Sequence, residues 1–390
     1  MQSAQPWPHL LGRRRARKRR SLGRIYAFAG HSDFMNDPFA TWFGLNAPEP
    51  ETPVSDNWGA EFGCSITAIA LTDTLNHGKD IVVGREDRLN LADSASGDHP
   101  RGGSVYIFRR SYLESLFTNP PPLDSKLINP VAPENRDPTA PEYQVLRNPF
   151  GDLQPLEPLE GEREPMWLDE FGWLVYDAGD VGSPNGGALD GIPDLVVHAQ
   201  STDFIGTGSL SAPQVDKVGG LFVYYGRGTS IGNLVTPSYV LLQKPSNLAA
   251  QYADPAEEDR IGRAFARLDQ WWDPNAQLLK PALLIGTKNA TFQGMKNAGM
   301  AFLMRLPVPA PADPPYYSAT WSNAWGSTPL LEPGGAAADH LFASWFIPLD
   351  YWGNQAAEPG QQFVVTSHGS PVGAILEAGK AYSYVPIAPP

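Results

Sequence analysis

The stretch that decides the fold begins with Phe171-Gly172-Trp173, becomes apolar again at Leu195-Val196-Val197, and ends with Gly219-Gly220-Leu221-Phe222-Val223-Tyr224-Tyr225. Between the first two runs lies a loop that is rich in acidic residues and glycine. Short runs of β-branched and aromatic residues bounded by such turns are typical of β-strands. The stretch therefore predicts a strand, an acidic loop, a buried strand and a glycine-led aromatic strand, in that order.

The same order occurs in three other parts of the chain, so residues 171–225 are interpreted as one unit of a repeat. The units open at residues 62, 171, 261 and 341, and their uneven spacing is expected when insertions are confined to loops. A glycine-led strand at 23–28 precedes the first unit and has no partner before it. The predicted units are residues 38–109, 142–225, 238–305 and 316–385.

Tandem units of four strands predict an all-β fold. Sheets placed side by side can bury both of their faces against their neighbours. Radial stacking of such sheets gives a β-propeller. We expect about four four-stranded blades plus an orphan N-terminal strand, within residues 23–386, in a ring that is incomplete or truncated. A β-sandwich with irregular strands is the competing prediction, but a sandwich does not require one four-part order to recur.

The composition agrees with many short strands joined by turns, since the chain has 38 Gly and 39 Pro and only 18% charged residues. Residues 112–168 form an insert rich in proline and glutamate, which we expect to be loop apart from a strand at Tyr143 to Leu146. The single cysteine, Cys64, excludes an internal disulfide framework. No run of 18 apolar residues occurs, so the sequence predicts no membrane-spanning helix.

The formal net charge of −13 is unevenly distributed along the chain. Residues 1–24 contain eight basic residues and no acidic one, which leaves 21 basic and 42 acidic residues in the rest. An acidic body argues against nucleic-acid binding and suits cation binding or an extracellular setting. We interpret the basic run 1–22 as a disordered tail or a product of truncation. A nucleic-acid or phosphoinositide patch and a localisation signal are the alternatives, and no apolar run typical of a secretory signal follows it.

The repeated pattern resembles the FG-GAP repeat of integrin alpha-subunit propellers and their bacterial relatives. The likeness rests on the openings Phe62-Gly63, Phe171-Gly172 and Ile261-Gly262, on the buried strands after the acidic loops, and on the glycine-led closing strands. Propellers of this family usually have more blades than this chain supplies. The resemblance implies a non-enzymatic extracellular or cell-surface module for binding or adhesion, with a protein or glycan ligand, and an oligomer if the ring is incomplete.

The resemblance also implies calcium in the loop that precedes the buried strand. Ca²⁺ prefers six to eight hard oxygen ligands, which a short loop of acids with a glycine at its turn can supply. The second unit matches best: Asp180, Asp190 and Asp194 offer carboxylates, Asn185 an amide oxygen and Ile192 a backbone carbonyl. Such calcium would be structural. The alternative is a solvated acidic turn.

The other units match the calcium pattern less well. The first unit offers Asp73, Asn76 and Asp80 in a shorter loop. In the third and fourth units, Lys280 and Gln362 precede the buried strand where a carboxylate would complete the ligand set. Losing a charged ligand weakens such a site, so we expect these two loops to be plain hairpin connections. Their remaining polar candidates are Asp269, Asp273, Asn275, Asp350 and Asn354.

The sequence is poor in signals for catalysis. It has no HExxH or HxH pattern, no GxSxG elbow and no glycine-rich phosphate loop. His198 and His368 occupy comparable places after two buried strands. A shared ligand contact at one end of the ring is one interpretation, and ordinary loop or rim histidines are the interpretation that we favour. Trp271 and Trp272 lie in a predicted polar loop, where aromatic rings can stack on sugars or contact a partner. Packing between neighbouring blades is the alternative that we favour for most of the tryptophans. The alternatives to a binding module are a propeller-type hydrolase or polysaccharide lyase, and a fragment of a larger propeller protein.

Overall fold

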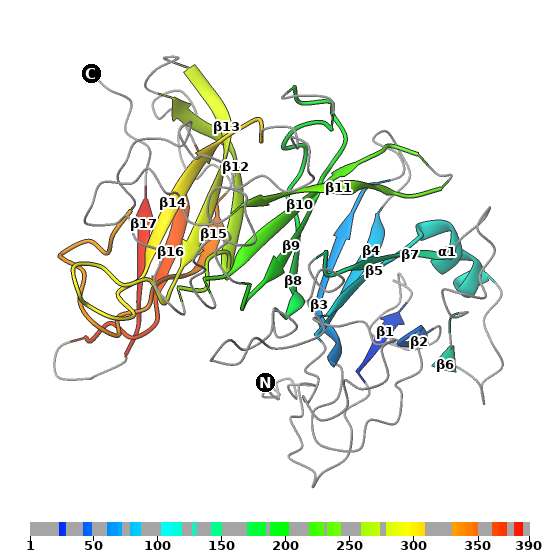
Figure 1. The fold of residues 1–390 in the computed structure, drawn as a ribbon, viewed down its shortest axis with the longest axis horizontal. Helices are drawn as coiled ribbons and strands as arrows, with labels where there is room; N and C mark the ends of the chain where they lie inside the picture. The colour runs from blue at the N-terminus through cyan, green and yellow to red at the C-terminus, as the bar shows by residue number, and fades with distance from the viewer. Residues whose placement is uncertain are drawn as a thin grey trace, which may run out of the picture.

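The structure is a computed structural model, and it describes residues 23–28, 42–48, 61–71, 79–86, 103–118, 127–128, 130, 142–149, 170–184, 188–202, 218–229, 232–242, 259–273, 278–308, 330–349, 361–372 and 378–384. Within these residues the protein is all-β apart from one short helix, as expected from the sequence (Figure 1). Its strands form five sheets. None of the described helical structure is long and apolar enough to cross a membrane.

The five sheets follow one another along the chain, except that the two-residue strand β6 of the first sheet comes after three strands of the second, and they are numbered here in that order. Sheet 1 contains β1 (Arg24–Phe28), β2 (Trp42–Asn46) and β6 (Leu127–Ile128); sheet 2 contains β3 (Glu61–Ile69), β4 (Asp80–Glu86), β5 (Ser104–Phe108) and β7 (Tyr143–Arg147). Sheet 3 contains β8 (Phe171–Asp177), β9 (Leu195–Ala199), β10 (Gly220–Gly226) and β11 (Val235–Leu242). Sheet 4 contains β12 (Ala264–Asp273), β13 (Leu278–Thr287) and β14 (Met300–Arg305); sheet 5 contains β15 (Phe342–Pro348), β16 (Phe363–Ser367) and β17 (Lys380–Tyr384).

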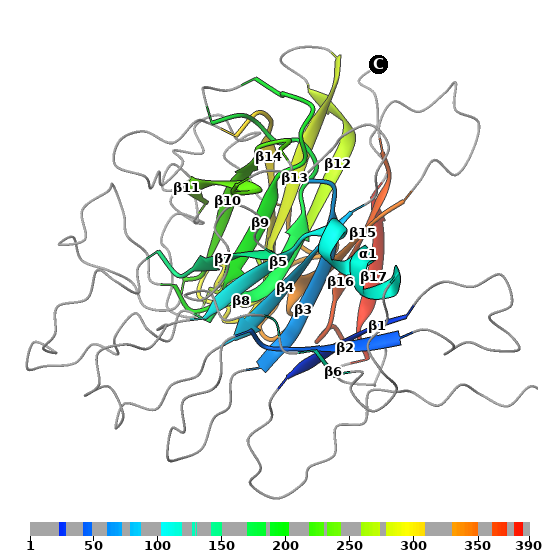
Figure 2. The ribbon, with the colours of Figure 1, turned by 90° about the vertical axis from the view of Figure 1, so that its right-hand side faces the viewer.

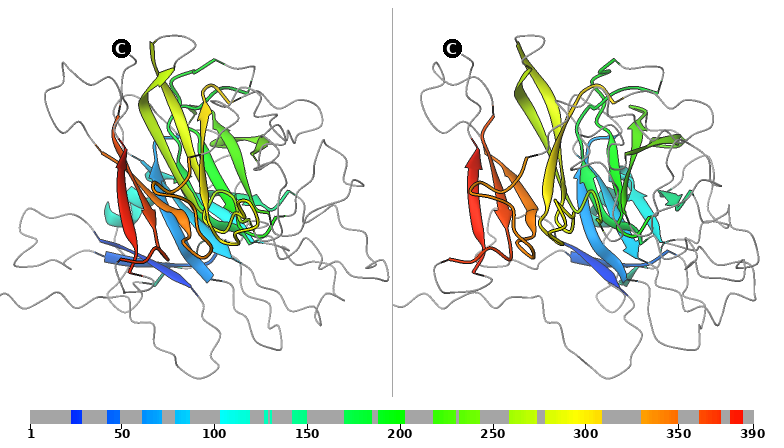
Figure 3. Two further views of the ribbon diagram at one scale, coloured as in Figure 1. Left: turned by 90° about the vertical axis from the view of Figure 1, so that its left-hand side faces the viewer. Right: turned by 60° about the vertical axis from the view of Figure 1, so that its left-hand side comes forward.

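Neighbouring strands within the sheets are antiparallel, except for the short parallel pair β2–β6. In Figure 1 the sheets succeed one another along the long axis, from blue at the right to red at the left. The sheets overlap in Figure 2, which is turned by 90°. The right-hand view of Figure 3 separates sheet 5, in red and orange, from sheet 4, in yellow. The sheets are therefore arranged as a sequential stack.

The core is divided among the junctions between successive sheets. Apolar side chains of sheets 1 and 2 form one buried cluster, those of sheets 2 and 3 a second, those of sheets 3 and 4 a third, and those of sheets 4 and 5 a fourth. The third and largest cluster includes Leu221, Val223 and Leu283. No cluster among the described residues joins sheet 1 to sheet 5. Each inner sheet is thus covered by apolar side chains on both faces.

One backbone contact recurs at all four junctions, between a glycine that directly precedes a strand of one sheet and the opening residue of the next sheet. A Cβ added to Gly23 would lie 1.8 Å from the carbonyl oxygen of Phe62, and one added to Gly103 would lie 2.0 Å from that of Phe171. A Cβ added to Gly219 would lie 2.8 Å from the backbone nitrogen of Ile261. Only glycine permits such close approach of two backbones. We call this arrangement the glycine contact.

The glycine contact of the fourth junction joins Gly299 to Phe342, with a distance of 2.1 Å from an added Cβ to the Phe342 carbonyl oxygen. This contact shows that the last sheet opens at Phe342, not at residue 341 as the sequence suggested. The expected glycine after the opening residue is present as Gly63, Gly172 and Gly262, all with positive φ, but sheet 5 has Ala343 there with φ 60°. The missing glycine explains why the sequence pattern misplaced this opening.

The strand pairings divide the chain differently from the expected units. β1 is not an orphan, because it pairs with β2. β7 pairs with β5 of the preceding sheet, and β11 pairs with β10. In sheets 2 and 3 the fourth strand therefore belongs to the sheet whose glycine-led strand precedes it in the chain. The sequence had assigned each of these strands to the following unit. Antiparallel strands close in sequence pair readily, and the apolar pattern alone does not say which neighbour a strand joins.

The Pro-rich insert contains more regular structure than expected. Helix α1 (Arg110–Thr118) begins directly after β5. Most of the helix lies within the predicted insert 112–168. Its Phe117 ring packs against Phe43 with ring centroids 4.7 Å apart, so the helix covers sheets 1 and 2 (Figures 1 and 2). The strand expected at Tyr143 is present as β7. The basic run 1–22 lies outside the described residues.

Candidate functional site

The acidic loop of sheet 3 joins β8 to β9 and is organised by Asp194. This residue is 1% exposed and stands directly before the buried strand β9. Its two carboxylate oxygens accept hydrogen bonds from the backbone N–H groups of Val181 (2.7 Å) and Gly226 (2.8 Å). Its own N–H donates to Gly179 O (2.8 Å). Asp194 therefore links both ends of the loop to the closing strand β10.

Asp80 has the same position and the same bonding in sheet 2. Its carboxylate accepts hydrogen bonds from the backbone N–H groups of Leu71 (3.2 Å) and Arg110 (3.0 Å), and the residue is fully buried. A carboxylate before the buried strand thus serves in two sheets to join the outgoing loop to the end of the closing strand. Asp73 and Asn76, the other candidates of this loop, lie outside the described residues.

Two further acids of the sheet 3 loop approach Asp194. Asp180 accepts a hydrogen bond from the N–H of Gly191 (2.5 Å), and Asp190 accepts one from the N–H of Ile192 (2.9 Å). The second carboxylate oxygen of Asp180, Oδ1, is buried and has no hydrogen-bond donor among the described residues. Asn185 lies outside those residues. A buried oxygen without a donor is unfavourable unless a cation or water faces it.

The three carboxylates influence one another electrostatically. The pKa of Asp194 is raised from its ordinary 3.8 to about 7. Burial is the main cause; the hydrogen bonds from the two backbone N–H groups oppose it, and the charges of Asp180 and Asp190 add to it. A nearby cation would favour the ionised form of all three acids. The loop is therefore an electronegative group of oxygens held together by backbone hydrogen bonds.

A guanidinium from sheet 4 already contacts the main chain of this loop. Arg267 on β12 donates through Nη1 to the carbonyl oxygens of Asp180 (2.7 Å) and Ala178 (3.3 Å), and through Nε to Asp269 (2.8 Å). Asp269 is thus paired within its own sheet, as suits a hairpin connection. Within the described part of the chain, no three His, Cys, Asp or Glu side chains are close enough together to ligate one metal ion. Calcium in this loop would need backbone oxygens as well as carboxylates.

Among the described residues of the loops in sheets 4 and 5, no buried carboxylate corresponds to Asp194 or Asp80. Gln361 of sheet 5 accepts a hydrogen bond from the backbone N–H of Asp269 (2.7 Å), so this amide links the two sheets. Asn275, Asp350 and Asn354 lie outside the described residues, and only the backbone of Asp273, in β12, is described.

The two histidines have different surroundings. His198 is fully buried, and its Nε2 donates to Ile261 O (3.1 Å), whereas His368 is exposed. His198 lies opposite Leu221 in the pairing of β9 with β10. The equivalent positions of sheets 2 and 4 are occupied by Gly84 and Gly286. Burial and then the positive charge of Arg263 lower the pKa of His198 to about 3. His198 is therefore a neutral link between sheets 3 and 4.

Two other side chains singled out by the sequence belong to sheet junctions. The Cys64 thiol is half-buried and lies 3.3 Å from Gly172 O of the next sheet. The Trp271 ring packs on Phe363 of sheet 5, with centroids 5.8 Å apart. Trp271 thus contributes to the apolar cluster between sheets 4 and 5, and is not a polar-loop residue.

A buried polar network at sheet 5 was not expected from the sequence. Glu332 accepts hydrogen bonds from Ser370 (2.5 Å) and Tyr382 (2.5 Å) and pairs with Nδ1 of His340 (2.5 Å). The hydroxyl donors lower the pKa of Glu332 against the opposing effect of burial, and His340 adds to them. The four residues are spread over residues 332–382 without a recurring spacing, so no sequence motif marks them. The network links the loop before sheet 5 to the turn after strand β16 and to strand β17.

Comparison with protein-family models and with curated proteins finds no match to this chain.

Proposed function

We propose that the protein is a propeller-type binding module, stabilised by calcium, that acts at the cell surface or outside the cell. Four observations support the propeller-type arrangement: the sheets are sequential, each junction has its own apolar cluster, the glycine contact recurs, and each opening strand begins with the same backbone shape. Radial stacking explains this recurrence, because each junction repeats one geometry. In this proposal the described sheets form an incomplete ring.

The acidic loop of sheet 3 is the proposed calcium site, and the buried Oδ1 of Asp180 is the observation that carries it. The proposed ligands are the carboxylates of Asp180, Asp190 and Asp194, the Asn185 amide oxygen and the Ile192 carbonyl. Calcium binding would have to draw the three carboxylates closer together than they lie in the described structure. An all-oxygen set with several negative charges suits Ca²⁺. The ion would neutralise the three acids and hold the loop against sheet 4. The loop of Asp73, Asn76 and Asp80 is a weaker second site, because Asp80 already accepts two backbone hydrogen bonds.

Binding without catalysis is the proposed activity, with a protein or glycan as ligand. Rigid sheets that present variable loops are a common way to build a binding surface. The buried histidine, the paired network at Glu332 and the backbone-bonded aspartates all have roles in holding sheets together. None of these described groups is left over as an evident nucleophile or general base.

Calcium binding is tested by titrating the purified, chelator-treated chain with CaCl₂ at pH 8, by calorimetry and by thermal unfolding. We expect measurable binding and a raised unfolding midpoint, because a ligand that binds only the folded state stabilises it. Asp180→Asn should weaken binding at least about tenfold, since it removes one charged ligand. Asp339→Asn is the matched control, because this exposed acid bonds Asn297 far from the loop in sequence. Absence of heat and an unchanged midpoint with EGTA would remove calcium from the proposal.

The binding activity is tested on a panel of immobilised neutral and acidic glycans, with calcium and with EGTA. Calcium-dependent retention without change to the glycan supports a binding module. Release of reducing ends or of unsaturated products from the same glycans would overturn the non-enzymatic assignment and favour a hydrolase or lyase.

A further inference from the structure

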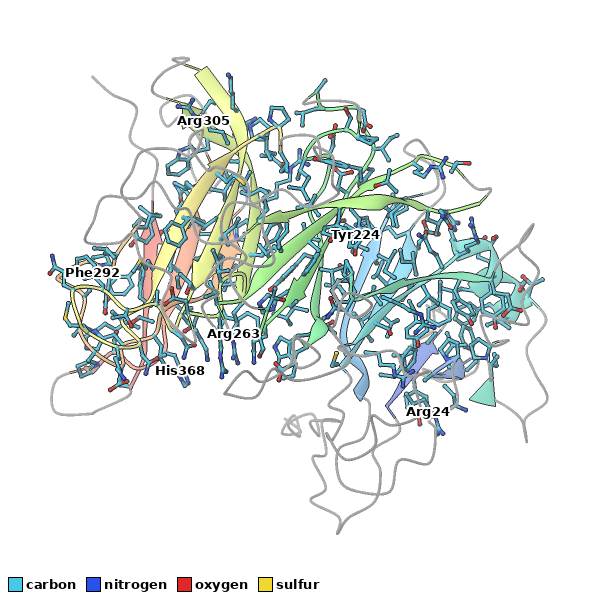
Figure 4. The ribbon with its side chains drawn as sticks, viewed as in Figure 1. Arg24, Tyr224, Arg263, Phe292, Arg305 and His368 are labelled. Carbon is cyan, nitrogen blue, oxygen red and sulfur yellow. The ribbon has the colours of Figure 1, made fainter. Side chains whose placement is uncertain are left out.

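The junction of sheets 3 and 4 brings three cationic side chains together at the end of the strands away from the acidic loop. Arg260 and Arg263 flank the opening residue of sheet 4, and Lys288 follows strand β13. The backbone holds these segments side by side: the N–H of Gly262 donates to Gly286 O (2.8 Å), and the Thr287 hydroxyl donates to Asp259 O. In Figure 4 Arg263 lies at the lower end of the strands of sheets 3 and 4, away from Arg305 at their upper end.

Two of the three cations, Arg263 and Lys288, have little opposing charge among the described residues. Among the described residues, neither the Lys288 amine nor the Arg263 guanidinium is in an ion pair. Arg263 donates one hydrogen bond, to the amide oxygen of Gln200 (3.2 Å), and Glu170 exerts only a minor attraction on it. The carboxylate of Glu170 accepts a hydrogen bond from the other end of Gln200 (2.9 Å).

The Lys288 amine has the least favourable surroundings of the three. It is half-buried and lies within electrostatic range of both guanidiniums. Burial, then Arg263 and then Arg260, lower its pKa to about 8. No described acid opposes these effects. Asp259, which directly precedes Arg260, is fully buried and accepts a hydrogen bond from the N–H of Thr291 (3.4 Å).

The acidic loop does not neutralise the group. Asp194 stands at the start of β9 and Gln200 just past its end, and five strand residues span about 16 Å. This separation exceeds the screening length of about 8–10 Å at physiological ionic strength. Sheet 3 thus has an electronegative loop at one end and a cationic group at the other.

We propose that Arg260, Arg263 and Lys288 form a binding site for a tetrahedral oxyanion, a sulfate or phosphate group, at the junction of sheets 3 and 4. Guanidinium groups bind such oxygens with paired N–H donors, and the lysine ammonium adds a compact charge. A doubly charged anion balances the cations better than a single carboxylate does. This site is separate from the calcium site, and neither proposal depends on the other.

The site is tested by thermal unfolding of the full chain in sodium sulfate, sodium phosphate or sodium acetate, each compared with NaCl at equal ionic strength. Sulfate also stabilises proteins without binding, so the comparison between variants is decisive. Lys288→Gln removes a cation of the site, and Lys296→Gln is the matched control, since Lys296 is an exposed lysine of the same turn region. We expect wild type and the control to bind sulfate or phosphate at least about tenfold more tightly than Lys288→Gln. Equal stabilisation of all three proteins would overturn the site.

A second measurement needs no variant. Wild-type protein is acetylated with a limiting amount of acetic anhydride at pH 8, with and without sulfate, and the modified lysines are quantified by mass spectrometry. We expect Lys288 to react readily in NaCl and to be protected by sulfate, while Lys296 reacts equally in both. Unchanged modification of Lys288 in sulfate and in phosphate would overturn the proposal. Protection by acetate alone would overturn the tetrahedral assignment in favour of a carboxylate.

Discussion

Replacing Gly103 by alanine would put a side chain into the glycine contact between sheets 2 and 3. The new Cβ would lie 2.0 Å from Phe171 O and 2.9 Å from Phe171 C, which are backbone atoms that cannot turn aside. Overpacking of this kind costs about 1–3 kcal/mol. Gly103 also has φ +98°, and a non-glycine residue in such a conformation costs about 1–2 kcal/mol more. The two effects together predict a loss of about 2–5 kcal/mol.

Gly334 provides the matched control for this substitution. Its φ of +93° is nearly that of Gly103, but a Cβ added there would meet nothing within 4 Å. Gly334→Ala should therefore lose only the conformational part, about 1–2 kcal/mol. Urea unfolding followed by far-UV circular dichroism measures both variants against wild type. Equal losses for the two variants would refute the glycine contact as the determinant of sheet spacing.

Three further predictions concern single residues of the described sheets. Ala343→Gly should stabilise the protein by about 1 kcal/mol, because glycine adopts the positive φ of residue 343 without strain. Urea unfolding should show a higher midpoint for the variant, and a lower midpoint would contradict the assigned backbone conformation. The pKa of Asp194 is raised in the folded protein, so the folded state binds more protons than the unfolded chain between pH 3.8 and about 7. The free energy of unfolding should consequently fall across this range as pH rises, and Asp194→Asn should lack that part of the slope in calcium-free buffer, whereas an identical pH profile would exclude a raised pKa. Glu332→Gln should lose about 1–3 kcal/mol and Tyr382→Phe about 1 kcal/mol, and a double-mutant cycle in urea should show coupling between them; additive losses would mean that the hydrogen bond is absent.

The strands of the inner sheets could be predicted from the sequence because their side chains alternate between two buried faces. The runs at Leu195 and Gly220 are fully buried, as their apolar composition indicated. The assignment of fourth strands failed for a physical reason. Tyr143–Arg147 is compatible in pattern with either neighbouring sheet, and only its pairing with β5 decides between them.

In the candidate site, likewise, the sequence predicted which residues share a loop but not their hydrogen-bond partners. The clustering of Asp180, Asp190 and Asp194 was predictable from one acidic loop. That both oxygens of Asp194 bond backbone N–H groups was not, because Gly226 lies on a different strand. The network of Glu332 depends on contacts across about 50 residues of sequence, which no local pattern encodes.

The division of the core among four separate junctions has a consequence for how the molecule comes apart. Each sheet is held by its immediate neighbours, so the cooperative unit is a pair of adjacent sheets. A pulling force applied to the two terminal sheets would therefore detach them one at a time, from the ends inward. Sheets 3 and 4, which share the largest apolar cluster, would separate last.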